Sequence, residues 1–410
     1  MKDRVILHSD ANCFYASCEM VLNPSLRGKA IAVGGHEEDR HGIILAKSEL
    51  AKLAGVKTGM PLWEARRLCP NIIIVPPHFE YYSKFSRLLR GIYERYTDYV
   101  EPFGLDECWL DVTACGEDGY VIAEEIRNTV KNELGLTVSI GVSFNKVFAK
   151  LGSDLKKPDA VTVISRENFK EKIWDLPVGE LLYCGRQTAK ALTSGGMPTI
   201  GTLARAQKET IVRRHGKNGE ALWIYANGLD TSRVAHKDAY VPPKSVGHGI
   251  TCRENLENID EASKVIVSLS LDIGYKLRKE KLWAGGVSLS VRDEHFMNYS
   301  YQMRLEFPSQ DERKIAKEAI SLLEKNYTWR AKIRAVTVTA ISIETDSAPL
   351  QQDMFFDYEE EDKRKRLGSV INDIKDTYGK ASILPATVLD EKKMPKGRQE
   401  DTVLPGMMHK

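Results

Sequence analysis

Two acidic sites in this chain could together hold a divalent cation. The first is Asp10, at the end of a short apolar run, and the second is the adjacent pair Asp106 and Glu107. Adjacent carboxylates repel each other and are tolerated when water or a cation neutralises them. Each site taken alone favours a simpler interpretation, because a lone Asp after a strand often caps the next helix and an acidic pair often lies in a solvated turn. If the three carboxylates met, they would form a site for a hard cation such as Mg²⁺.

The elements around these residues indicate how they could meet. Gly104 gives the backbone the freedom to form a tight turn just before the acidic pair. The predicted order is strand, inserted segment, helix, hairpin, helix and strand, which is typical of a βαββαβ sheet in an α+β protein. In such a sheet the end of the first strand lies close to the tip of the central hairpin. The predicted elements are strand 5–10, helix 79–96, hairpin strands 99–103 and 108–112, helix 122–134 and strand 137–142.

Basic residues follow the last of these strands. If residues 145–157 form a helix, Lys146, Lys150 and Lys157 share one face of it, before a strand at 160–164. In the inserted segment 26–75, the spacing predicts a strand at 30–33 and a helix over 43–53 that carries Lys52. The alternative for both sets of lysines is a solvated helix face.

The pattern of residues 176–203 predicts paired short helices joined by glycines. This arrangement is typical of a helix-hairpin-helix. The backbone N–H groups of such a motif, here at Gly185, can hold a phosphate without reading sequence. A small helical bundle is the alternative interpretation. The polar segment 231–244, with its paired prolines, indicates a linker.

Residues 244–344 predict a separate α/β domain with strands at 286–291, 299–305 and 333–343 and helices at 260–277 and 311–325. On its first strand Arg292 shares a face with two serines, while Val287, Leu289 and Val291 share the other. Basic and hydroxyl side chains on one face of a sheet suit a phosphate backbone, although either strand alone could have a merely solvated face. The same pattern recurs at Arg330, Lys332 and Arg334.

Composition limits the other possibilities. The 410 residues indicate about two to four domains, and the net charge of +2 means that any nucleic-acid surface must come from local clustering. The seven cysteines contain no CxxC spacing, so neither a disulfide framework nor a zinc site is expected. No apolar run reaches the roughly 18–20 residues of a membrane span, and no signal-peptide pattern is present, so we expect a cytoplasmic protein.

Taken together, these motifs resemble those of the Y family of DNA polymerases, the translesion type related to DinB and UmuC. Residues 10–17 are similar to the first catalytic motif, residues 105–107 to the second, and residues 141–158 to the third. The resemblance runs from Val5 to about Glu344, with a short peptide in the tail.

The resemblance implies a right-hand polymerase fold with a ferredoxin-like palm and a helix-hairpin-helix thumb. The implied domains are a palm of residues 1–17 and 76–165, fingers of 18–75, a thumb of 166–233, a linker of 234–240, a little finger of 241–345 and a tail of 346–410.

The resemblance also implies residue roles and binding partners. Asp10, Asp106, Glu107 and the Ala11 carbonyl would hold two Mg²⁺ ions, and Tyr15 would be the steric gate that excludes a ribose 2′-hydroxyl. The implied dNTP contacts are Phe14, Lys52 and Lys157, and the implied DNA contacts are Lys146, Lys150, Gly185, Arg292, Arg330, Lys332 and Arg334. The partners would be primer–template DNA, a dNTP and the bacterial sliding clamp, bound by a monomer.

The clamp contact is implied by Gln351, Met354 and Phe355, which are similar to the clamp-binding peptide of this family. Apolar side chains in an otherwise polar tail also suit docking into a partner's groove.

The fingers depart from the family pattern. Where the family usually has Ser/Thr, Tyr and Arg on a finger helix, this chain has Ala46, Glu49 and Lys52. A second departure is Tyr183, in the thumb hairpin, where the family usually has Gly.

Three functional hypotheses follow. The first is a template-directed, low-fidelity translesion DNA polymerase that lacks proofreading. The second is a non-catalytic DNA- and clamp-binding adaptor of the same fold, which the changes at Ala46 and Glu49 motivate and the intact carboxylates oppose. A nucleotide cyclase with the same sheet and metal chemistry is disfavoured, because it would not need the thumb, the basic domain or the tail peptide.

Overall fold

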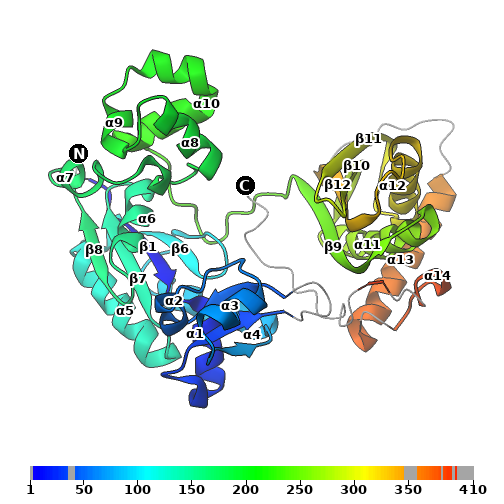
Figure 1. Cartoon of the computed structure of the whole chain (residues 1–410), viewed down its shortest axis with the longest axis horizontal. Coiled ribbons are helices and arrows are strands. Elements are labelled where there is room, and N and C mark those ends of the chain that lie inside the picture. The colour runs from blue at the N-terminus through cyan, green and yellow to red at the C-terminus, as the bar shows by residue number, and fades with distance from the viewer. Residues whose placement is uncertain (1–2, 36–41, 346–357, 380–381, 390–392, 395–410) are drawn as a thin grey trace. The chain divides into compact units, whose positions relative to one another are not determined.

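The computed structural model of the chain describes residues 3–35, 42–345, 358–379, 382–389 and 393–394 (Figure 1). These residues form two compact units, one of residues 3–34 and 44–240 and one that begins at Val241. No helix in the described part of the chain has the length and apolar character needed to cross a membrane.

The first unit contains a five-stranded sheet in the order β5-β6-β1-β7-β8 and a three-stranded sheet in the order β3-β2-β4. In chain order its elements are β1 (Ile6–Ala11), α1 (Phe14–Leu22), β2 (Ile31–Gly34), β3 (Ile44–Lys47), α2 (Glu49–Leu53), α3 (Leu62–Leu68), β4 (Ile73–Val75), α4 (Phe79–Tyr93), β5 (Val100–Pro102), β6 (Glu107–Asp111), α5 (Gly119–Leu134), β7 (Val138–Ser143), α6 (Lys146–Leu155), β8 (Val161–Ile164), α7 (Phe169–Ile173), α8 (Arg186–Ser194), α9 (Ile200–Ala204) and α10 (Lys208–Ala226).

The larger sheet confirms the predicted α+β arrangement. β1 lies at its centre and pairs antiparallel with both β6 and β7, and all six residues of β1 are buried. Helix α6 packs directly on β7, because a Cβ at Gly141 would lie only 1.9 Å from the carbonyl oxygen of Ala149. This close approach brings α6, and the lysines that it carries, against the sheet.

Two helix predictions need correction. The segment 43–53 is not one helix, because residues 44–47 pair with β2 as β3 and the Ser48 side chain then accepts a hydrogen bond from Ala51 N and starts α2. Lys157 does not share a helix face with Lys146 and Lys150, because α6 ends at Leu155.

Helices α7 to α10 form the last part of the first unit (Figure 1). Their apolar side chains share a core with α6, which contributes Val147, Phe148 and Leu151. The predicted helix-hairpin-helix segment contains a turn at Tyr183, whose φ of 65° lies in the left-handed region that favours glycine. α8 then begins directly after Gly185.

The second unit is built on a four-stranded antiparallel sheet in the order β11-β10-β12-β9. Val287, Leu289 and Val291 of β10 are buried in its core together with apolar side chains of α11 and α12, so the two helices cover that face. β9 was not predicted from the sequence. The elements are β9 (Ser245–Leu256), α11 (Ile259–Lys279), β10 (Leu282–Asp293), β11 (Asn298–Ser309), α12 (Glu312–Asn326), β12 (Ile333–Thr345), α13 (Tyr358–Tyr378) and α14 (Ala386–Leu389).

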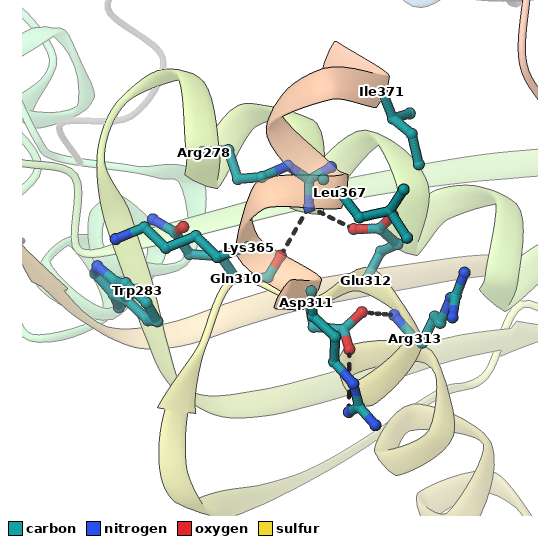
Figure 2. Close-up of a pocket in the computed structure, with 11 residues that line it drawn as sticks. Arg278, Trp283, Gln310, Asp311, Glu312, Arg313, Lys365, Leu367 and Ile371 are labelled. Atoms are coloured by element: carbon teal, nitrogen blue, oxygen red, sulfur yellow. Dashed lines mark hydrogen bonds and ion pairs between the residues drawn. The ribbon is translucent and has the colours of Figure 1, made fainter. Parts of the chain in front are cut away.

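Within the second unit, helix α13 packs beside Arg278 of α11 (Figure 2). The Arg278 guanidinium donates to Glu312, to the Gln310 carbonyl and to the Asn372 side chain on α13. It also packs against Gly368, where a Cβ would lie 3.1 Å from the guanidinium. The tail helix is therefore packed closely onto the body of this unit.

Candidate active site

The three carboxylates lie at one edge of the larger sheet. Asp10 is the register partner of Glu107 on the neighbouring antiparallel strand, so the two side chains leave the sheet on the same face. Asp106 lies in the turn just before β6, and its carbonyl accepts a hydrogen bond from Ala11 N at 3.0 Å. Gly104 permits this turn with a φ of +97°.

Burial and neighbouring charge both act on these carboxylates. Burial, together with the charges of Asp10 and Glu107, raises the pKa of Asp106 to about 7. Burial also raises the pKa of Asp10 to about 6, against the opposing charge of Lys157. The pKa values of both groups are therefore raised chiefly by burial, with neighbouring negative charge adding to the effect.

Two lysines form ion pairs with Asp10 and Glu107. Lys157 Nζ lies 2.8 Å from Asp10 Oδ2 and 2.9 Å from Asp154 Oδ1, while Lys150 Nζ lies 2.5 Å from Glu107 Oε2. Burial alone would raise the pKa of Glu107, but the adjacent His8 ring and the charge of Lys150 bring it down to about 2. Glu107 is therefore ionised at neutral pH.

His8 lies behind Glu107 and is fully buried. Its Nδ1 is 2.9 Å from Ser153 Oγ, and Nε2 is 3.3 Å from Glu107 Oε2 without an aligned hydrogen bond. Burial lowers the pKa of His8 to about 4, so the ring is neutral at pH 7. The polar edge of this ring therefore faces the carboxylate site.

The donor set fits Mg²⁺. Asp10, Asp106 and Glu107 offer hard carboxylate oxygens, and their crowded negative charge favours a bound cation. In the described part of the chain no three His, Cys, Asp or Glu side chains already stand together as metal ligands. Asp10 and Glu107 instead form ion pairs with lysine ammonium groups.

Tyr15 is held by a stack of aromatic rings. Its ring lies parallel to that of Tyr82 on α4, with centroids 4.3 Å apart, and it contacts the rings of Phe14 and Phe79. The Tyr82 hydroxyl is anchored in turn by Glu19. Burial, with the charge of Asp106, raises the pKa of Tyr15, so this ring stands near the carboxylate site.

The finger residues lie on two different elements. Ala46 lies on β3, where it pairs with Val33 of β2. Glu49 is instead the first residue of α2. The Glu49 carboxylate accepts a hydrogen bond from the Cys13 thiol at 3.1 Å and lies 3.5 Å from Lys52 Nζ. α2 is thus connected to the loop between Asp10 and Tyr15.

The candidate DNA contacts of the first unit lie on two elements, with Lys146 and Lys150 on α6 and Gly185 at the start of α8. Lys146 forms a 2.6 Å ion pair with Glu101 and lies over the Trp109 ring. Lys150 contacts Glu107 at the carboxylate site. Gly185 is the residue before the first turn of α8, where backbone N–H groups are exposed to a ligand.

The open face of the second unit's sheet is hollowed and rich in hydroxyl groups. Arg292 lies in this hollow and donates to Asn298. Lys332 is paired with Glu257 at 2.6 Å, Arg334 lies over the Phe296 ring, and Arg330 is exposed. The hollow is lined by Ser245, Gly247, Gly249, Ile250, Thr251, Ser290, Val291, Arg292, Asn298, Ala335, Thr337 and Thr339.

Several of these residues were missed by the sequence analysis. His8 lies two residues before Asp10 and therefore on the same face of β1, which was a usable signal. The contribution of β9 to the hollow had no comparable signal. Gln351, Met354 and Phe355 lie outside the described residues.

Comparisons with known proteins agree with this geometry. Residues 9–154 match the impB/mucB/samB family, and residues 243–354 match the C-terminal domain of that family. The chain is 44% identical to "DNA polymerase IV" of Acetivibrio thermocellus, over 95% of this chain and 98% of that protein. It is 34% identical to "DNA polymerase IV 1" of Bacillus subtilis, over 97% of this chain and 96% of that protein.

A solved structure shares the fold. A chimera of the Y-family DNA polymerases Dbh and Dpo4 matches with a TM-score of 0.76 at 22% identity, covering 83% of this chain and 100% of the chimera. The likeness extends over both units, since the family matches lie on either side of Val241. The chain therefore belongs to the impB/mucB/samB family, the Y family of DNA polymerases.

Proposed function

We propose that this chain is a template-directed, low-fidelity DNA polymerase that joins a dNTP to a primer 3′-hydroxyl with two Mg²⁺ ions. The observation that carries the proposal is the placement of Asp10 opposite Glu107, with the adjacent Asp106 joined to β1 by the hydrogen bond from Ala11 N to its carbonyl. The relatives named DNA polymerase IV support the same activity.

The metal ligands would be Asp10, Asp106, Glu107 and the Ala11 carbonyl. When bound, the two ions supply positive charge that favours loss of the 3′-hydroxyl proton and stabilises the leaving pyrophosphate. Asp10 and Asp106 would supply carboxylate oxygens to the ions, and Glu107 would add a third carboxylate. Lys150 and His8 would keep Glu107 ionised and oriented, since both contact its Oε2.

The dNTP would be held by side chains on three elements. Lys157 is the cation next to Asp10, so it suits the triphosphate as a point charge. Phe14 and Tyr15 would line the sugar, with the Tyr15 ring fixed by its stack on Tyr82. Lys52 would approach from the fingers.

The DNA would run over the thumb and the open sheet face of the second unit. Hydroxyl groups, glycines and Arg292 in the hollow allow a phosphate backbone to approach closely. We assign the palm to 1–17 and 76–165, the fingers to 18–75, the thumb to 166–233, the little finger to 241–345 and the tail to 346–410.

The proposal includes two accessory properties. The enzyme would extend primers past damaged template bases without a proofreading exonuclease, because nothing in the sequence predicts an exonuclease site. The tail peptide at Gln351, Met354 and Phe355 would recruit it to the sliding clamp as a monomer.

Primer extension tests the proposal. Wild-type protein with primer–template, dNTPs and Mg²⁺ should extend the primer, and Asp106→Ala should reduce extension by at least about a hundredfold. Asp98→Ala removes an exposed carboxylate that pairs with Lys237 and should leave extension unchanged. Wild-type protein that binds DNA but adds no nucleotide would instead establish the adaptor hypothesis, which the changes at Ala46 and Glu49 favour.

A further inference from the structure

The beginning of helix α2 places a carboxylate between the fingers and the loop that follows Asp10. Glu49 is the first residue of α2, and its two oxygens have different partners. Oε1 accepts from the Cys13 thiol at 3.1 Å, and Oε2 lies 3.5 Å from Lys52 Nζ. Glu49 thus contacts both the loop before Tyr15 and the lysine of this short helix.

The position of Cys13 shows which loop the Glu49–Lys52 pair lies beside. Cys13 follows Ala11 and Asn12 and directly precedes α1, with a φ of 50° that fixes the turn out of β1. Its thiol donates to Glu49 Oε1, so this turn is joined directly to the first residue of α2. The Glu49–Lys52 pair is therefore within electrostatic range of the loop that carries the Ala11 carbonyl and the Tyr15 ring.

This arrangement has a consequence for any triphosphate that binds there. A dNTP is a polyanion, and Lys52 is the basic residue in the last turn of α2. While Glu49 holds Lys52, the ammonium charge is partly neutralised and a carboxylate adds repulsion. Both side chains are well exposed, at 51% for Lys52 and 37% for Glu49, so the pair is weak enough for a ligand to break.

We propose that Glu49 competes with the dNTP triphosphate for Lys52 and thereby sets a weak nucleotide affinity. The inference rests on the proposed polymerase function and deepens it, because it assigns a specificity-determining role to a side chain that departs from the family pattern. Glu49 is a positioning residue here, since it acts on the nucleotide through Lys52. Its removal should strengthen nucleotide binding rather than impair it.

The expected changes have opposite signs for the two residues. Glu49→Gln keeps the side-chain volume and an acceptor for the Cys13 thiol but removes the charge. It should lower the dissociation constant for a dNTP by about three- to tenfold, and the effect should shrink as salt is added. Lys52→Ala should raise the dissociation constant. In the Lys52→Ala background, Glu49→Gln should have no further effect, because no lysine is left to compete for.

Equilibrium binding of dNTP to protein on a dideoxy-terminated primer–template measures these constants without turnover. Glu64→Gln, the same change on α3 of the same finger segment, is the matched control and should leave the constant unchanged. Thermal unfolding of each variant checks folding. Steady-state extension should then show the change in KM, with kcat within about twofold.

Three outcomes would overturn the proposal. The first two are an unchanged and a raised dissociation constant in Glu49→Gln. The third is an effect of Glu49→Gln that persists in the Lys52→Ala background, which would mean that the Glu49 carboxylate repels the dNTP directly. A failure of the proposed polymerase function would give a different result. Wild-type protein would then not extend an ordinary primer, although the dNTP dissociation constants of the variants could still be measured.

Discussion

Lys157 Nζ lies between two carboxylates, 2.8 Å from Asp10 Oδ2 and 2.9 Å from Asp154 Oδ1. One lysine thus contacts a proposed metal ligand and is also the proposed triphosphate contact. Burial would lower the pKa of Lys157, but the charges of Asp10 and Asp154 and the hydrogen bonds to both together raise it, so the side chain stays charged at physiological pH.

Lys157→Ala should change metal and nucleotide binding in opposite directions. The dNTP dissociation constant should rise by about tenfold or more, because a charged contact to phosphate is lost. Mg²⁺ should bind the nucleotide-free protein more tightly, because no ammonium competes for Asp10. Thermal shift against Mg²⁺ concentration measures the second effect, and Lys156→Ala, at the neighbouring exposed lysine, is the control. Weaker Mg²⁺ binding in Lys157→Ala would contradict this account.

The contribution of Asp106 to the stability of the metal-free protein should fall as pH rises from about 4 to 7. The pKa of Asp106 is raised from 3.8 to about 7, so in this window the folded state binds more protons than the unfolded state. Above pH 7 the buried charge is present in full, and Mg²⁺ should then stabilise the protein most. Asp106→Asn should remove both effects and raise the metal-free stability at pH 8 by on the order of 2 kcal/mol.

Thermal unfolding from pH 5 to 8, with chelator or with Mg²⁺, measures these effects. Glu64→Gln should preserve the wild-type pH profile. An Asp106→Asn protein whose pH profile matches that of the wild type would show that Asp106 is not held in its raised-pKa environment.

Tyr15→Ala should increase incorporation of ribonucleotides relative to deoxyribonucleotides by about 10- to 100-fold. The ring is fixed by its stack on Tyr82, so it cannot turn away from a 2′-hydroxyl without breaking that stack. Competitive extension with dNTP and rNTP measures the preference. Tyr99→Ala, at an exposed tyrosine, should leave it unchanged, and an unchanged preference in Tyr15→Ala would remove the gate assignment.

Arg292→Ala should weaken DNA binding about equally for all sequences and should reduce the slope of log K against log salt by about 0.9. Lys332→Ala should have a smaller effect, because Lys332 is already paired with Glu257. Lys314 lies on α12, which covers the other face of the sheet, so Lys314→Ala is the control. Equal salt slopes for wild type and Arg292→Ala would show that the DNA lies elsewhere.

Replacing residues 351–356 with glycine and serine should abolish stimulation by the sliding clamp and leave distributive synthesis intact. The replacement keeps the length of the segment between β12 and α13, so the anchoring of α13 through Arg278 is preserved. Extension assays with and without loaded clamp measure the difference. Stimulation that survives would place the contact on another surface.

The five-stranded sheet could be predicted from the sequence, because the residue patterns that define its strands are local. Apolar runs and turn residues define β1 and the β5–β6 hairpin, and the topology then brings Asp10 to Glu107. The apolar alternation of β10 likewise predicted which face is buried. The family resemblance added the order and names of the domains.

The remaining contacts depend on residues far apart in the chain. Lys150 meets Glu107 across 43 positions, and neither residue's neighbours indicate the pairing. β9 has few large apolar side chains, and its glycines are required by the threonines opposite, since a Cβ at Gly249 would lie 2.2 Å from Thr337 Oγ1. The start of α2 was predictable in principle, because Ser48 followed by Glu49 is an N-terminal helix signal.

The central position of β1 determines how fast this site can respond to its ligands. Because β1 is hydrogen-bonded on both sides, the backbone at Asp10 is immobilised by two neighbouring strands. The cationic groups next to Asp10 and Glu107 are instead the ends of two flexible lysine side chains. Side-chain rotations take picoseconds to nanoseconds, so ion entry should proceed without waiting for the slower motions of whole domains.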